Sequence, residues 1–124
     1  MPGEKDAVLS EAEIRNRLED LPGWSVEDNH LQRRYRTHGW KSTLMVVNTV
    51  GHLAEAAWHH PDLVVSYNAV TVRLTNHDAG GITEKDFQLA RKFDDVVLRQ
   101  PGKEGCALTG TPRTDPRHAY IRYE

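Results

Sequence analysis

The sequence has very little cysteine: Cys106 stands alone among 124 residues, which excludes an internal disulfide and fits a reducing compartment. It also lacks a long apolar run that could span a membrane, and the N-terminus, MPGEKDAVLSEAE, has no signal-peptide core. A basic excess is missing too, since 16 Lys and Arg residues face 18 Asp and Glu residues. Proteins that bind phosphate backbones usually show such an excess. These absences predict a soluble cytoplasmic protein with no membrane and no nucleic-acid partner.

The length suits one domain with a modest core. Regular apolar patterns occupy residues 1–99, which we expect to form that domain. From Gln100 onward the chain is rich in Pro, Gly and Thr and has no sustained period. We therefore predict that residues 100–124 form a C-terminal tail that is flexible or partly docked, with 119–123 as the piece that could dock.

The first half of the chain predicts a helix, two strands and a longer helix. Ser10 and Glu13 form a capping-box pattern that opens the first helix, which Pro22 is expected to end. Residues 24–36 resemble two short strands joined by a turn-forming Asp-Asn pair. A helix over 39–58 should end before Pro61, because proline disfavours helical backbone in the residue before it. Its apolar face is predicted to hold Leu44, Val47, Val50, Ala54, Ala57 and Trp58.

The second half predicts a hairpin and a last helix. Two β-rich segments meet near Asn68, and in the second one apolar residues alternate with polar ones. If that strand continued two residues further, His77 would join its polar face. Thr83 and Asp86 form a second capping-box pattern, which opens a helix with an apolar stripe. The order helix, strand, strand, helix, strand, strand, helix predicts an α+β fold: a four-stranded antiparallel sheet with three helices on one face.

Five side chains are candidates for chemistry: Glu55, His59, His60, His77 and Asp86. Glu55 and His59 are four residues apart, a spacing that puts both on one face of a helix. His59 and His60 come directly before Pro61, at the predicted helix exit, and His77 and Asp86 bracket a Gly-rich loop.

Each candidate also has an ordinary structural explanation. Single surface histidines are common, Asp86 can serve only as a capping acid, and Glu55 can be a solvated helix residue. His and carboxylates are also ligands for zinc and iron. Adjacent histidines seldom share one metal, however, and no HxH, HExxH or Cys pair accompanies them. No metal is therefore expected.

The candidates resemble a family signature when they are taken in order. Glu55, His59-His60-Pro61, Tyr67, His77 and Asp86 follow one another with the spacing seen in pterin-4a-carbinolamine dehydratases. The resemblance includes the aromatic residues Tyr35 and Trp40 and the segment SYNAVTVRLTNHDAGGITEKDF, and it covers roughly residues 10–98. The tail after Arg99 lies beyond the usual end of the family's core.

The resemblance implies a hydro-lyase that dehydrates 4a-hydroxytetrahydropterin to quinonoid dihydropterin in pterin cofactor recycling, and that works as a homodimer or homotetramer without a cofactor. This substrate is the carbinolamine left by tetrahydropterin-dependent aromatic amino acid hydroxylases. Imidazole, with an unperturbed pKa of ~6.5, can protonate the leaving oxygen or accept the N5 proton.

The resemblance also implies a role for each residue. His59 and His77 would be proton donors at the 4a-hydroxyl group, approaching from different sides. His60 would bind the pterin and could transfer protons, Glu55 and Asp86 would orient imidazoles, and Pro61 would fix the bend.

A binding module is the rival hypothesis. Relatives of these dehydratases serve as a dimerisation cofactor of a homeodomain transcription factor and as Rubisco assembly factors. Such a role does not need proton-transfer residues, and this chain has the whole set. The sequence therefore favours the enzyme.

Overall fold

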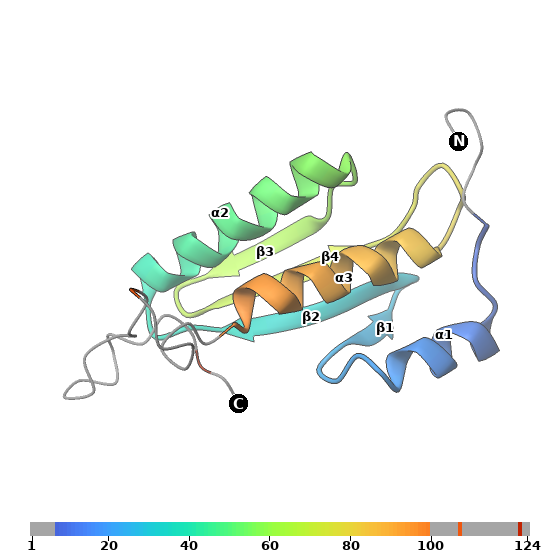
Figure 1. The fold of residues 1–124 in the computed structure, drawn as a ribbon, viewed down its shortest axis with the longest axis horizontal. Coiled ribbons are helices and arrows are strands. Elements are labelled where there is room, and N and C mark those ends of the chain that lie inside the picture. The colour runs from blue at the N-terminus through green and yellow to red at the C-terminus, as the bar shows by residue number, and fades with distance from the viewer. Residues whose placement is uncertain (1–6, 100–106, 108–121, 123–124) are drawn as a thin grey trace.

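The computed structural model describes residues 7–99, 107 and 122 and shows three helices and four strands (Figure 1). In chain order they are α1 (Glu11–Leu18), β1 (Ser25–Glu27), β2 (His30–Arg36), α2 (Trp40–Ala57), β3 (Asp62–Ser66), β4 (Ala69–Leu74) and α3 (Glu84–Val97). The predicted order of elements is confirmed.

The strands form one antiparallel sheet in the order β1-β2-β4-β3. Leu31 and Tyr35 of β2 lie opposite Leu74 and Val70 of β4, and all four side chains are buried. In Figure 1 the long helices α2 and α3 run along the same side of the sheet, and α1 lies beside β1. The predicted α+β fold, with the helices on one face of a four-stranded sheet, is confirmed.

Helix α3 supplies the helical half of the core. Phe87, Ala90, Phe93 and Val97 recur at three- and four-residue steps and are all fully buried. They pack with the alternating apolar residues of β4 in a single cluster. The predicted apolar stripe is confirmed, and Leu98, which follows directly after the end of the helix, is half-buried against the same core.

Helix α2 is turned differently from the prediction. Val50 and Ala54 are buried as expected, but Leu44 is 41% exposed and Trp58 is 74% exposed. The buried face instead begins with Ser42, Thr43 and Val46. Thr43 explains the rotation, because its hydroxyl donates to the carbonyl of Tyr67 at 2.9 Å and lies 2.6 Å from the hydroxyl of Thr37. These bonds fix the start of α2 through polar groups that an apolar pattern does not reveal.

Helix α1 begins as predicted and ends early. The Ser10 hydroxyl accepts from the Glu13 amide at 3.2 Å, and the Glu13 carboxylate accepts from the Ser10 amide at 3.0 Å, so the capping box is confirmed. The helix ends at Leu18 rather than near Pro22. A tighter turn follows, in which the Leu21 amide donates to the Leu18 carbonyl at 3.1 Å and brings Leu21 into the core.

The hairpin between β1 and β2 has the turn that the sequence predicts. Asp28 and Asn29 both have left-handed backbone, with φ of 50° and 60°, which is the geometry of the predicted two-residue hairpin.

No helix in the described part of the chain is long and apolar enough to cross a membrane. The predicted tail lies outside the described residues apart from positions 107 and 122. Of these, Arg122 donates its backbone N–H to the carbonyl of Arg36 at 3.1 Å.

Candidate functional site

The bend after α2 points two histidines away from the helix. Trp58 has left-handed backbone, with φ 49° and ψ 47°, and its amide turns back to the last carbonyls of the helix. The His59 amide also bonds back, to the Ala54 carbonyl at 3.1 Å. These bonds satisfy carbonyls that a helix end otherwise leaves free, and Pro61 prevents any further helical turn. His59 and His60 therefore leave the helix axis at a fixed point.

His59 is held by a buried carboxylate. Its Nε2 contacts Oδ1 of Asp86, and the two side chains are 12% and 0% exposed. The other oxygen, Oδ2, accepts from the Thr83 amide at 2.8 Å and from the Thr83 hydroxyl at 3.3 Å. Asp86 also lies in the first turn of α3, where the helix dipole favours negative charge. The arrangement fixes the imidazole and leaves Nδ1 as the ring nitrogen that can face a ligand.

His60 is paired with Glu55 at the surface. Its Nε2 donates to Oε1 of Glu55 at 2.8 Å, and the side chains are 53% and 68% exposed. The ring also meets the Trp58 indole edge-on, with centroids 5.1 Å apart. The sequence placed Glu55 and His59 on one helix face, which is wrong, because α2 ends at Ala57 and the bend carries His59 toward α3 instead.

His77 lies on a loop rather than on an extended strand. Strand β4 ends at Leu74, and Asn76 then pairs with Gly81 to close a turn in which Gly80 has a φ of 86°. His77 is exposed there, and its ring lies 6.4 Å from that of His30. The strand does not continue as far as His77, so the condition under which His77 would join the polar face of β4 is not met. The described contacts do not join His77 to His59 or His60, although its loop leads directly to Thr83 and Asp86.

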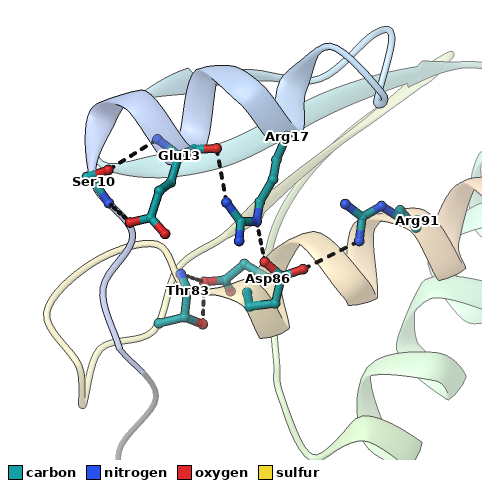
Figure 2. Close-up of polar contacts among 7 residues, drawn as sticks. Ser10, Glu13, Arg17, Thr83, Asp86 and Arg91 are labelled. Carbon is teal, nitrogen blue, oxygen red and sulfur yellow. Dashed lines mark hydrogen bonds and ion pairs between the residues drawn. The ribbon is translucent and has the colours of Figure 1, made fainter.

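The start of α3 is tied to α1 by charged side chains that the sequence reading missed. Figure 2 shows Arg17 of α1 directed at the first turn of α3, where its guanidinium contacts the carboxylate of Glu84. Arg91, further along α3, approaches the other oxygen of Glu84 at 3.6 Å. A backbone bond from Leu9 to the Ile82 carbonyl at 2.9 Å joins the same two segments. These contacts stabilise the turn that carries Asp86. In the sequence, the acidic residues Glu84 and Asp86 at the start of α3 are the feature that could have indicated them.

A second polar network joins helix α3 to strand β2 and to Trp24. Asp94 of α3 accepts from the Trp24 indole at 2.9 Å and from the Tyr35 hydroxyl at 2.6 Å, and Arg33 lies 3.4 Å away. Burial raises the pKa of Tyr35 above its ordinary value, and the negative charge of Asp94 adds to the effect. The partners are separated by about sixty residues of sequence, so the sequence alone could not pair them. Trp24 and Tyr35 belong to the core, which indicates a structural role for the network.

The described residues contain no group of three or more His, Cys, Asp and Glu side chains placed to hold a metal ion. His59 and His60 each contact a single carboxylate, that of Asp86 and that of Glu55. Glu84 contacts an arginine.

A family model for pterin 4 alpha carbinolamine dehydratase matches residues 7–96. The chain belongs to this family. A relative from Aquifex aeolicus, named "Putative pterin-4-alpha-carbinolamine dehydratase", is 51% identical over 72% of this chain and 90% of its own length. A relative of the same name from Picosynechococcus is 49% identical over 71% of this chain and 96% of its own.

A solved structure shares the dehydratase fold. The transcriptional coactivator/pterin dehydratase from Brucella melitensis has a TM-score of 0.67 and 30% identity, over 70% of this chain and 95% of that one. The family match ends at residue 96, so it includes all five candidate site residues and none of the tail.

Proposed function

We propose that the protein is an active pterin-4a-carbinolamine dehydratase, which removes water from 4a-hydroxytetrahydropterin. The observation that carries this proposal is the pair of imidazole–carboxylate contacts, His59 with Asp86 and His60 with Glu55, at one rigid bend. A fixed imidazole beside a carboxylate is suited to general acid–base catalysis at neutral pH. The proposal includes pterin cofactor recycling in the cytoplasm as the setting.

The dehydration needs two proton transfers. The C4a–O bond breaks, the oxygen takes a proton and leaves as water, and N5 loses its proton while its electron pair forms the C4a=N5 bond. His59 supplies one proton to the leaving oxygen, and its contact with the buried carboxylate of Asp86 holds the ring in place for that transfer. His77 serves hydroxyl groups on the other side of the ring. His60 binds the pterin, and the exposed Glu55 keeps its ring in position.

Stereoisomer-resolved kinetics test these roles. Dehydration of the two 4a-hydroxy stereoisomers should slow unequally in His59→Ala and in His77→Ala. The double variant should lose more than either, about 10²-fold or more, which is the scale of lost general acid catalysis. His60→Ala should raise KM at least as much as it lowers kcat.

His52→Ala is the matched control, because His52 is an exposed histidine of α2 outside the proposed set. It should leave both rates within about twofold of the parent, as expected for a surface substitution. If the His59/His77 double variant dehydrates both isomers at the parent rate while remaining folded, the enzymatic proposal fails.

The exposed apolar side chains of α2 favour a binding role as the second candidate. Trp40, Leu44 and Met45 are each more than two-fifths exposed on one helix, and large apolar surfaces of this kind commonly mark protein contacts. The Brucella structure is itself described as a coactivator as well as a dehydratase. A chain with parent-like assembly but no turnover on either isomer would favour this non-catalytic role, as a transcriptional dimerisation cofactor or a Rubisco assembly factor.

A further inference from the structure

The loop that carries His77 begins beside the first residue of β2. Strand β4 ends at Leu74, which lies opposite Leu31 in the antiparallel sheet. His30, the residue before Leu31, is therefore next to the chain as it leaves β4. The ring of His30 lies 6.4 Å from the ring of His77, and the two planes meet at 71°. Aromatic rings favour this edge-to-face arrangement at centroid separations of roughly 4.5–7 Å.

His30 is itself held in one orientation. Its backbone pairs with Glu27 in the hairpin of β1 and β2, and its side chain is partly buried. The Nδ1 atom lies 2.7 Å from the backbone carbonyl of Asp28. Because a carbonyl oxygen only accepts hydrogen bonds, Nδ1 carries a proton and is the donor. The ring of His30 is thus a fixed surface for the ring of His77.

A second contact joins the turn between β1 and β2 to the same loop. The side-chain amide of Asn29 donates from Nδ2 to the Gly80 carbonyl at 3.3 Å. Within the loop, the amides of Gly80 and Gly81 both donate to the Asn76 carbonyl, at 2.9 and 3.2 Å. The turn therefore contacts a closed loop at two places, and one of them is the ring of His77.

His77 is held differently from the other two candidate histidines. His59 and His60 each contact a carboxylate. In the part of the chain that the structure describes, no acidic side chain is paired with His77. The contact with His30 orients the ring of His77 by packing rather than by a charge.

We propose that the turn between β1 and β2 positions His77, and that His30 thereby sets the rate at which one 4a-hydroxy stereoisomer is dehydrated. This inference rests on the proposed function, in which His77 serves one side of the pterin ring. His30 is a positioning residue, since it acts through His77 and not on the substrate. A proton donor must lie within hydrogen-bond reach of the leaving oxygen, and a misplacement of about 1 Å can cost about 10²-fold in rate.

Stereoisomer-resolved kinetics of the full-length protein test this role. His30→Ala should lower kcat about tenfold for the isomer that His77→Ala also slows, and should change kcat for the other isomer by less than about twofold. His30→Phe keeps a ring and should restore most of the lost rate. Asn29→Gly removes the bond to Gly80 and tolerates the left-handed backbone, so it should also slow the isomer that depends on His77.

His38→Ala is the matched control, because His38 is a partly buried histidine beyond the other end of β2. It should leave both rates within about twofold of the parent. The χ1 coupling constants of His77, measured by NMR, give a second result that needs no turnover. They should show one rotamer in the parent and in His30→Phe, and an average over rotamers in His30→Ala.

Equal slowing of both isomers in His30→Ala would overturn the inference, because general damage to the fold would then explain the loss. Parent-like rates for both isomers in His30→Ala would overturn it as well, and so would a failure of His30→Phe to restore the lost rate. A parent that is inactive on both isomers would instead defeat the proposed function, and the rotamers of His77 would still decide whether the turn positions its ring.

Discussion

Asp86 serves two elements with one fully buried carboxylate. One oxygen accepts from the Thr83 amide at the start of α3, and the other contacts His59 at the end of α2. Each contact uses one oxygen of the carboxylate, and the first turn of a helix favours negative charge. Because the same side chain caps a helix and orients an imidazole, the two functions cannot be separated at this position. This is why the structural and catalytic readings of Asp86 were both reasonable from the sequence.

Tyr35 should make the fold sensitive to alkali. Its pKa is raised above 10.0 by burial and by Asp94, so the folded protein keeps the phenolic proton while the unfolded chain releases it near pH 10.0. The unfolded state is therefore favoured progressively above that pH. The parent should lose up to about 1.4 kcal/mol of unfolding free energy per pH unit relative to Tyr35→Phe. At neutral pH, Tyr35→Phe should instead be less stable by about 1 kcal/mol, because Asp94 loses a donor.

Urea unfolding at neutral pH and above pH 10.0 measures both effects. Tyr67→Phe is the control, because Tyr67 is 67% exposed and lies outside the core. Equal alkaline slopes for the parent and Tyr35→Phe would contradict the assignment.

At the scale of elements, the bend after α2 decides where the histidines lie. The first residue of this bend, Trp58, adopts a left-handed conformation that costs most L-residues about 1 kcal/mol. The Trp58 side chain is mostly exposed and offsets little of that cost by burial. We expect Trp58→Gly to be more stable than Trp58→Ala by about 1 kcal/mol, since both lack the indole and only glycine relieves the strain. Chemical denaturation of the two variants measures the difference, and equal stabilities would show that the bend is unstrained.

Local patterns predicted the elements well and their contacts less well. The capping boxes at Ser10 and Thr83 located two helix starts, because each box is made within four residues of sequence. The rotation of α2 depends on Thr43 bonding to a distant turn, and the partner of Glu55 depends on where that helix ends. Tertiary packing decides both, so apolar periodicity could not. The position of His77 was missed for a similar reason, since Gly80 and Gly81 turn the chain after β4.

At the scale of the whole molecule, the fold leaves exposed apolar surfaces that we expect a second chain to cover. Strand β3 pairs only with β4, and its outer side is a free edge among the described residues. Its valines Val64 and Val65 are 59% and 39% exposed. An apolar edge strand of this kind readily pairs with another strand. A second apolar surface runs along α2 at Trp40, Leu44 and Met45.

We therefore predict a homodimer joined through β3 edges, which can pair into a homotetramer through α2. In a symmetric pair, Val64→Lys places like charges close together at the joined edges and should weaken association at least about tenfold. Val26→Lys is the matched control, because Val26 is a 40% exposed valine on the opposite edge strand, β1. Sedimentation equilibrium should give multiples of 14.1 kDa for the parent and for Val26→Lys, and a shift toward the single chain for Val64→Lys. A parent that sediments only as a 14.1 kDa monomer at micromolar concentration would rule out both contacts, because each requires a second chain.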